Sequence, residues 1–139
     1  MKKIVLIFLF LPFISFGQLD YKSYNKAVKY NSKGNIKKAI KYAYKSLEDN
    51  PSWRKPNLLL ASIYINLDSI ELAANFILKV YERKNPKDVV LLEKLIKLYY
   101  SNGYYYEALS FLDIVLSDSL KMNFNVERYI NNCNFAIES

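Results

Sequence analysis

Few side chains in this sequence belong to the types that usually carry catalysis. The chain has no histidine, so its one cysteine, Cys133, lacks the imidazole partner that activates a thiol, and histidine-based zinc sites are excluded. The acidic residues Glu71, Glu82, Glu93 and Glu107 are scattered at helical positions that suit solvent. Neither a glycine-rich phosphate loop nor an aspartate-rich calcium loop is present. We therefore predict a non-enzymatic protein with no catalytic residues, metal site, cofactor or small-molecule substrate.

Tyrosines gather in the stretch YYSNGYYYEAL, residues 99 to 109, where five of them surround Gly103. Such rings could form a surface for a base, a sugar or a peptide, or they could pack inside the fold. The spacing of the neighbouring residues separates these alternatives, because part of this stretch occurs twice more upstream.

The pattern Tyr-x3-(Gly/Asp)-x4-Ala occurs three times at a nearly constant distance. Its tyrosines lie 34 and then 35 residues apart, and apolar residues at three-and-four spacings flank each copy, which is the periodicity of amphipathic helices. The copies are Tyr30, Gly34 and Ala39; Tyr64, Asp68 and Ala73; and Tyr99, Gly103 and Ala108. The period indicates an internal structural repeat.

Each repeat is predicted to be a helix, a tight turn and a second helix. Gly34 and Gly103 stand where a helix ends and a positive φ is required, and Asp68 tolerates that conformation or caps the next helix. Pro51 and Pro86 should mark the ends of the second helices, because the residue before a proline disfavours helical geometry.

These units resemble the tetratricopeptide repeat, a helical hairpin of 34 residues. Its first-helix core is matched by Leu60, Ala61 and Tyr64, by Leu95, Ile96 and Tyr99, and in part by Ala27 and Tyr30. The close-contact alanine of its second helix is matched by Ala39, Ala73 and Ala108. The pattern departs at the leading tryptophan, replaced by Ser23, Asn57 and Leu92, and at the second-helix aromatic, replaced by Ala43, Ile77 and Leu112.

The resemblance implies an all-α fold, an α-solenoid of three tetratricopeptide-like helical hairpins with a C-terminal capping helix. The expected repeats span about residues 20–53, 54–88 and 89–122, and the capping helix about 123–138, which together form one domain of residues 18–139. An irregular helical bundle is the alternative, but a bundle does not require this period.

The N-terminus, MKKIVLIFLFLPFISFGQ, has the three regions of a secretory signal peptide. Lys2 and Lys3 precede an apolar run from Ile4 to Phe13, and small residues follow up to Gly17. We predict a signal peptide of residues 1–17 and an exported protein, with the periplasm favoured over secretion into the medium. An uncleaved anchor is the alternative, although the run is shorter than the ~20 apolar residues that span a bilayer.

Basic residues concentrate near the start of the chain. Residues 18–55 contain ten Lys or Arg and three Asp or Glu, whereas residues 56–139 contain eight and ten. The predicted export argues against a nucleic-acid partner. Lys22, Lys26, Lys29 and Lys33 form one stripe of a helix, and a stripe of this kind suits the outer face of a terminal repeat. A functional patch for an acidic partner or for lipid head groups, and thus a peripheral membrane contact, is the alternative.

The later repeats carry mostly apolar residues at these stripe positions, as expected where one hairpin packs on the hairpin before it. The equivalents are Pro56, Leu60, Ile63 and Leu67, then Leu91, Leu95, Leu98 and Asn102. At the other end of the array, the capping helix should cover the third repeat with one apolar side, formed by Val126, Tyr129, Ile130, Cys133 and Ile137. Cys133 is then a buried apolar residue rather than a reactive thiol or a bridge to another chain.

In proteins with this repeat, ligands contact mainly first-helix positions on the concave side of the array. The resemblance assigns to that side Tyr24, Val28 and Asn31, then Leu58, Ser62 and Asn66, then Glu93, Lys97, Tyr100 and Ser101. This mixture implies amide and hydroxyl groups for a peptide backbone, with Tyr24, Leu58 and Tyr100 as apolar anchors.

The expected function is a scaffold or adaptor of the bacterial cell envelope that binds a peptide or helix of a protein partner. The alternative function is docking on anionic lipid through the basic first repeat. Among the five clustered tyrosines, Tyr99 recurs as Tyr30 and Tyr64 and should pack inside its hairpin. Tyr100 is a candidate ligand contact, whereas the sequence assigns no role to residues 104–106.

Overall fold

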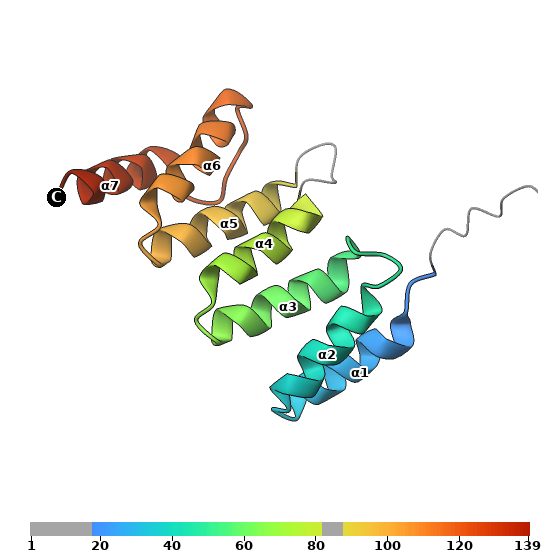
Figure 1. The fold of residues 1–139 in the computed structure, drawn as a ribbon. Helices are drawn as coiled ribbons and strands as arrows, with labels where there is room; N and C mark the ends of the chain where they lie inside the picture. Colours follow the sequence, from blue (N-terminus) through green and yellow to red (C-terminus); the bar gives the residue numbers. More distant parts are fainter. Residues whose placement is uncertain (1–17, 82–87) are drawn as a thin grey trace, which may run out of the picture.

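The computed structural model describes residues 18–81 and 88–139, and every regular element in those ranges is an α-helix (Figure 1). The predicted all-α class is therefore confirmed. The predicted signal peptide and Pro86 lie outside the described residues. The helices are α1 (Tyr21–Ser32), α2 (Ile36–Ser46), α3 (Arg54–Asn66), α4 (Ile70–Tyr81), α5 (Val89–Ser101), α6 (Tyr105–Ser117) and α7 (Val126–Glu138).

Consecutive helices pack on one another along the whole described chain. The tightest pairs are α1 with α2, α3 with α4, and α5 with α6, and these three hairpins follow one another in a row that ends with α7 (Figure 1). Further contacts join α2 to α3, α4 to α5 and α6 to α7. The result is a helical, repeat-like architecture with mostly local contacts.

The turn inside each hairpin has the same backbone geometry. Gly34 and Gly103 have φ values of 73° and 81°, as predicted, and Asp68, for which a helix cap was the alternative, has a φ of 57°. In each turn the carbonyl of the repeated tyrosine accepts a hydrogen bond from the amide five residues later, at 2.8–2.9 Å. This bond satisfies a carbonyl that the helix end leaves unpaired and closes the turn.

Each repeated tyrosine also stacks on an aromatic ring of its own second helix. The three pairs are Tyr30 with Tyr42, Tyr64 with Phe76, and Tyr99 with Phe111, with ring centroids 5.5–5.8 Å apart and interplanar angles of 12°, 1° and 11°. Tyr99 is buried, which confirms that it packs inside its hairpin. Each repeat therefore has an aromatic residue in its second helix. It lies one position before Ala43, Ile77 or Leu112, the residues that the sequence comparison placed there.

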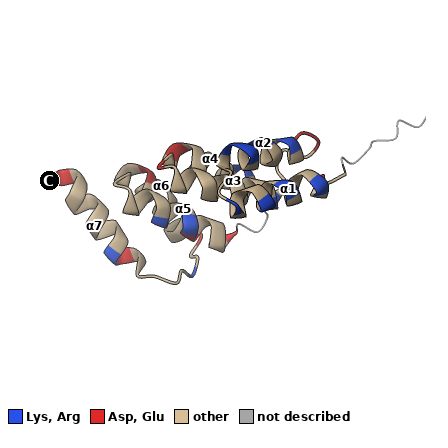
Figure 2. Ribbon diagram, turned by 90° about the horizontal axis from the view of Figure 1, so that it is seen from below, with Lys and Arg blue, Asp and Glu red and all other residues tan. Residues whose placement is uncertain are grey.

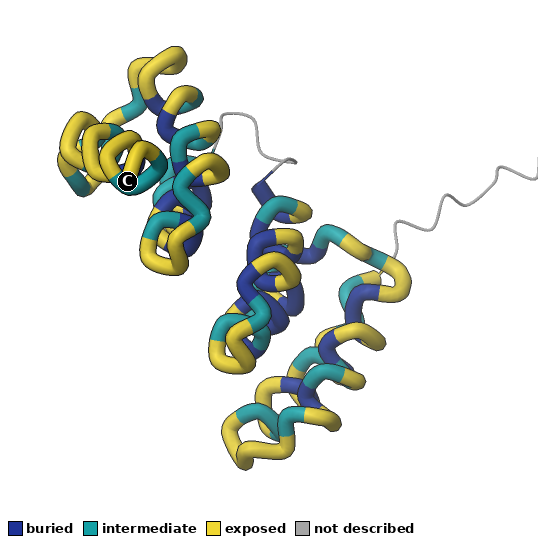
Figure 3. The backbone as a smooth tube through the Cα atoms, turned by 60° about the vertical axis from the view of Figure 1, so that its left-hand side comes forward, coloured by how far each residue is buried: buried dark blue, intermediate teal, exposed yellow. Residues whose placement is uncertain are grey.

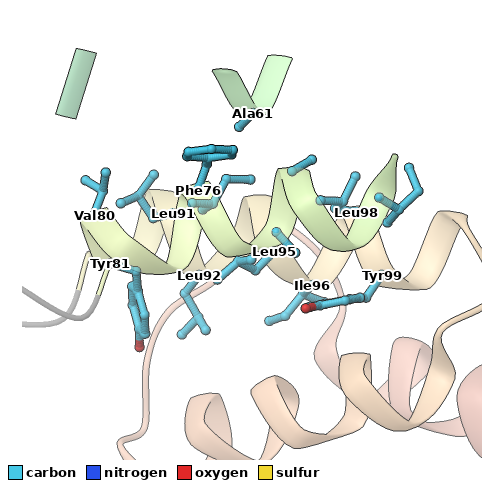
Figure 4. Packing of buried hydrophobic residues seen from close by; sticks show 14 of the residues in the cluster. Ala61, Phe76, Val80, Tyr81, Leu91, Leu92, Leu95, Ile96, Leu98 and Tyr99 are labelled. Carbon is cyan, nitrogen blue, oxygen red and sulfur yellow. The ribbon is translucent and has the colours of Figure 1, made fainter. Parts of the chain in front are cut away.

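Buried residues lie on the inner sides of the helices and exposed residues on the outer sides (Figure 3). Leu60, Ile63, Leu91 and Leu95 are buried, as expected for contacts between hairpins. In Figure 4, Leu91 and Leu98 lie on the side of Ala61 and Phe76, and Leu92, Ile96 and Tyr99 lie on the opposite side. The α5 helix is therefore apolar on two sides, because it packs on both the preceding and the following helix.

The expectation for Leu67 was wrong. This residue is 49% exposed, because it is the C-cap of α3 and lies beyond the last residue of the helix. The second helix of the first repeat also ends earlier than Pro51 suggested. It stops at Ser46, and Leu47 to Trp53 form a loop. Asn57 of α3 holds this loop by donating hydrogen bonds to the carbonyls of Pro51 and Trp53.

The last helix begins at Val126, a few residues after the expected start at 123. Asn125 sets this boundary, because its side chain accepts a hydrogen bond from the amide of Arg128 at 2.9 Å and caps the helix. The helix packs against α6, with Cys133 fully buried and with Val126, Tyr129 and Ile130 partly buried against the core.

Candidate functional site

The ten residues that the sequence assigned to ligand binding lie on α1, α3 and α5, the first helices of the three hairpins. We call the surface formed by these ten residues the first-helix face. Its members have different surroundings in the first two hairpins and in the third.

Aromatic rings anchor the first-helix face in the first hairpin. The ring of Tyr24 lies 5.3 Å from that of Trp53, and Tyr21 meets Trp53 edge-on at 4.8 Å. Trp53 itself is buried. Tyr24 and Leu58 are half-buried and pack against the core. Part of each apolar side chain is therefore held in place by the core, and the other part is exposed to solvent.

The polar members of this part are open. Ser62 and Asn66 are exposed and Asn31 is half-buried, while Val28 is 41% exposed. Among residues 18–81 and 88–139, none of the side chains of Asn31, Ser62 and Asn66 has a hydrogen-bond partner. Their amide and hydroxyl groups are free to bind a backbone from another chain.

In the third hairpin, by contrast, the predicted residues bond to one another and to their own helix. The ammonium of Lys97 donates to the carboxylate of Glu93 at 2.5 Å, one turn away on α5. This hydrogen bond raises the pKa of Lys97. The hydroxyl of Ser101 donates to the carbonyl of Leu98 at 3.3 Å.

The chain's own C-terminal segment, residues 118–138, contacts this part at Tyr100 and Lys97. The ring of Tyr100 lies 4.4 Å from Tyr129 of α7, and its hydroxyl accepts a hydrogen bond from the amide of Asn132 at 3.0 Å. Phe124 lies 4.4 Å from Tyr129, and the ammonium of Lys97 lies over the ring of Phe124 at 5.7 Å. Tyr100 thus serves an internal contact, and a pocket of about 360 Å³ beside it is lined by Phe124, Arg128 and Asn132.

Sequence reasoning did not assign Phe124 or Asn132 to this face. Neither residue belongs to the repeated pattern, because the C-terminal segment has no counterpart upstream. Tyr129 was expected only as a packing residue of the last helix. Residues 118–138 therefore occupy the third part of the first-helix face around Tyr100, whereas Lys97 and Ser101 remain exposed there.

A second exposed aromatic group lies where α2 meets the second hairpin. The hydroxyls of Tyr44 and Tyr64 are 3.4 Å apart, and the ring of Tyr44 meets Phe76 edge-on at 5.8 Å. Burial in the first place, and the hydrogen bond with Tyr64 in the second, raise the pKa of Tyr44 to about 12. A pocket of about 390 Å³ opens beside these rings, lined also by Leu72 and Lys79.

Within residues 18–81 and 88–139, no three His, Cys, Asp or Glu side chains come close enough to hold a metal ion. None of the helices in these ranges has the length and apolar character needed to cross a membrane.

The thiol of Cys133 should be protected in the folded protein. Its side chain is fully buried, and burial raises the pKa of the Cys133 thiol, so little of the reactive thiolate is present at neutral pH. We expect a disulfide reagent such as Ellman's reagent to modify Cys133 at least about tenfold more slowly in buffer than in denaturant. Equal rates in the two conditions would contradict the packing of α7.

Comparison with known proteins assigns no family to the chain. Neither the protein-family models nor the curated proteins give a match.

Proposed function

We propose that the chain is a non-enzymatic scaffold or adaptor that holds a segment of a partner protein on its first-helix face. The observation that carries this proposal is the set of open, unpaired amide and hydroxyl side chains at Asn31, Ser62 and Asn66 beside the fixed apolar side chains of Tyr24 and Leu58. A partner's extended backbone or polar helix face finds donors and acceptors there, and its apolar side chains find two anchors.

The recurring turns and ring stacks support a tetratricopeptide-like α-solenoid for this chain. In such an array the first helices line a concave surface, because each hairpin is rotated slightly against the previous one. A concave surface of stacked helices suits an extended peptide or a single helix. The apolar run near the N-terminus, preceded by Lys2 and Lys3, supports an exported protein that meets its partner in the cell envelope.

The C-terminal segment limits the length of the partner segment. Because Tyr100 already contacts Tyr129 and Asn132, the proposed partner occupies α1 and α3 and stops before α5. Lys97 is held by Glu93, so it does not serve as a free cation for a terminal carboxylate. The proposal therefore favours an internal peptide segment or a helix over a free C-terminus.

A matched pair of variants tests this proposal. The first combines Asn31→Ala, Ser62→Ala and Asn66→Ala, and the control combines Asn75→Ala, Ser110→Ala and Asn134→Ala on α4, α6 and α7. All the control side chains are exposed. We expect the first variant to lose at least about tenfold of the partner recovered after crosslinking in the cell envelope, because two or three hydrogen bonds of about 0.5–1.5 kcal/mol each disappear. The control should retain partner recovery.

Circular dichroism checks that both variants fold. Equal recovery of the partner with the two variants would refute binding on the first-helix face. Equal loss with both would place the partner elsewhere on the protein.

A further inference from the structure

The first hairpin carries eight exposed lysines and no acidic residue between Tyr21 and Leu47. We call these side chains the lysine surface; its members are Lys22, Lys26 and Lys29 of α1, Lys33 at the C-cap of α1, and Lys37, Lys38, Lys41 and Lys45 of α2. Figure 2 shows basic residues gathered on these two helices, whereas acidic residues lie in the turn after α2 and on later helices. We propose that the lysine surface docks the protein on a membrane that contains anionic lipids.

The charges of this surface are not neutralised within the protein. Among the described residues, none of the eight ammonium groups forms an ion pair or a hydrogen bond. Asp20, at the start of α1, interacts with the charges of Lys22 and Lys45 but forms no ion pair with either. The surface therefore presents a net positive field to the solvent.

Two contacts show that the surface extends over both helices of the hairpin. The ammonium of Lys26 in α1 lies 5.1 Å from the ring centre of Tyr42 in α2, and that of Lys38 in α2 lies 5.2 Å from the ring centre of Tyr30 in α1. Tyr30 and Tyr42 stack on each other. Lys26 of α1 and Lys38 of α2 thus meet around one aromatic pair, so lysine side chains of the two helices lie on either side of the helix contact.

An end cap alone does not explain this composition. A terminal repeat needs a polar outer face, and a mixture of both signs would provide one without repulsion. Here lysines repeat at i and i+4, as in Lys22 with Lys26 and Lys37 with Lys41, and like charges at this spacing destabilise a helix. An end cap explains only the stripe of Lys22, Lys26, Lys29 and Lys33. It does not explain why α2 carries four further lysines.

The chemistry of the surface fits a lipid bilayer better than a defined peptide. Arginine, whose planar group binds one carboxylate or phosphate through two hydrogen bonds, is absent from both helices. Lysine acts as a point charge, and a row of lysines is attracted to many anionic head groups without a fixed geometry.

Sedimentation with vesicles of phosphatidylcholine containing about one third phosphatidylglycerol tests this proposal on the full chain. We expect binding that weakens at least about tenfold between 50 and 500 mM NaCl, since salt shortens the range of surface charges. Vesicles of phosphatidylcholine alone should bind far less protein. This comparison needs no variant, so it stands even where a substitution disturbs folding.

Three charge-matched variants locate the binding surface. One changes Lys22, Lys26, Lys29 and Lys33 to Gln, the second changes Lys37, Lys38, Lys41 and Lys45 to Gln, and the control changes Lys55, Lys79, Lys94 and Lys121 to Gln. Each removes four charges, and glutamine keeps the helix propensity of lysine. We expect each of the first two to weaken binding at least about tenfold, and the control to change it by less than about threefold.

Three results would overturn the proposal. Equal loss in all three variants would mean that net charge alone drives binding. Salt-independent binding that is the same in every variant would assign it to the apolar N-terminal run. A glutamate-rich peptide that binds one-to-one and more tightly than the vesicles would make the surface a protein-binding site. The partner recovery of the first-helix variants is a separate readout, so each proposal can fail alone.

Discussion

Replacing Leu60 with Lys should remove a large part of the stability of the fold. Leu60 is fully buried in the core cluster, and a lysine there would bring an unpaired charge into the core. Leaving a buried charge without a partner costs about 3–5 kcal/mol, a large part of the stability of a domain of this size. Urea denaturation followed by circular dichroism measures this loss.

The equivalent position of the first hairpin provides the control. Lys26 stands 34 residues before Leu60 and is exposed. The reverse substitution, Lys26→Leu, should change the free energy of unfolding by no more than about 0.5 kcal/mol. If Lys26→Leu lowered the free energy of unfolding as much as Leu60→Lys, the side chain of Lys26 would not simply face solvent. This result would refute the end-cap explanation of α1.

The second large effect is expected at the centre of the ring stacks. Phe76 is 4% exposed, stacks on Tyr64 at 5.6 Å and meets Tyr44 edge-on at 5.8 Å. Phe76→Ala should lower the free energy of unfolding by about 3–5 kcal/mol, because it removes both ring contacts and leaves a cavity between two hairpins. The same denaturation experiment measures it.

Phe135 of α7 provides the matched control for this substitution. Its ring is 76% exposed, so Phe135→Ala should cost no more than about 0.5 kcal/mol. A loss below about 1 kcal/mol for Phe76→Ala would mean that the contact between the first two hairpins contributes little to stability.

The turns of the fold were predictable from single residues. A positive φ is costly for most side chains, so Gly34 and Gly103 indicated two turns directly. Asp68 could be recognised only by its place in the repeat, because aspartate is common in many other contexts. The tyrosines before these turns were predictable for the same reason, since they recur at a fixed distance.

The aromatic partners of these tyrosines carried a signal that the pattern comparison missed. Tyr42, Phe76 and Phe111 recur 34 and 35 residues apart, like the tyrosines themselves. The comparison used positions 43, 77 and 112, which hold small or aliphatic residues. Alignment on the internal period of this chain, rather than on an outside pattern, finds the three rings.

The candidate site was only partly predictable. The 34-residue repeat and the periodicity of a helix together predict which residues lie on the first helices. The placement of Asn31, Ser62 and Asn66 on α1 and α3 therefore depended on local structure alone. The contact of Tyr100 with Tyr129 and Asn132 depends on how the chain returns after α6, and no repeated pattern describes residues 118–125. Tertiary packing of a unique segment leaves no periodic trace in a sequence.

The proposed binding of a partner on the first-helix face is tested most directly by site-specific photo-crosslinking in the native envelope. A photoreactive amino acid at Ser62 of α3 probes that face, and the same group at Asn75 of α4 probes the second helix of the same hairpin; both sites are exposed. We predict one crosslinked protein from position 62 and none from position 75. The same crosslinked protein from both positions, or from position 75 alone, would contradict the account.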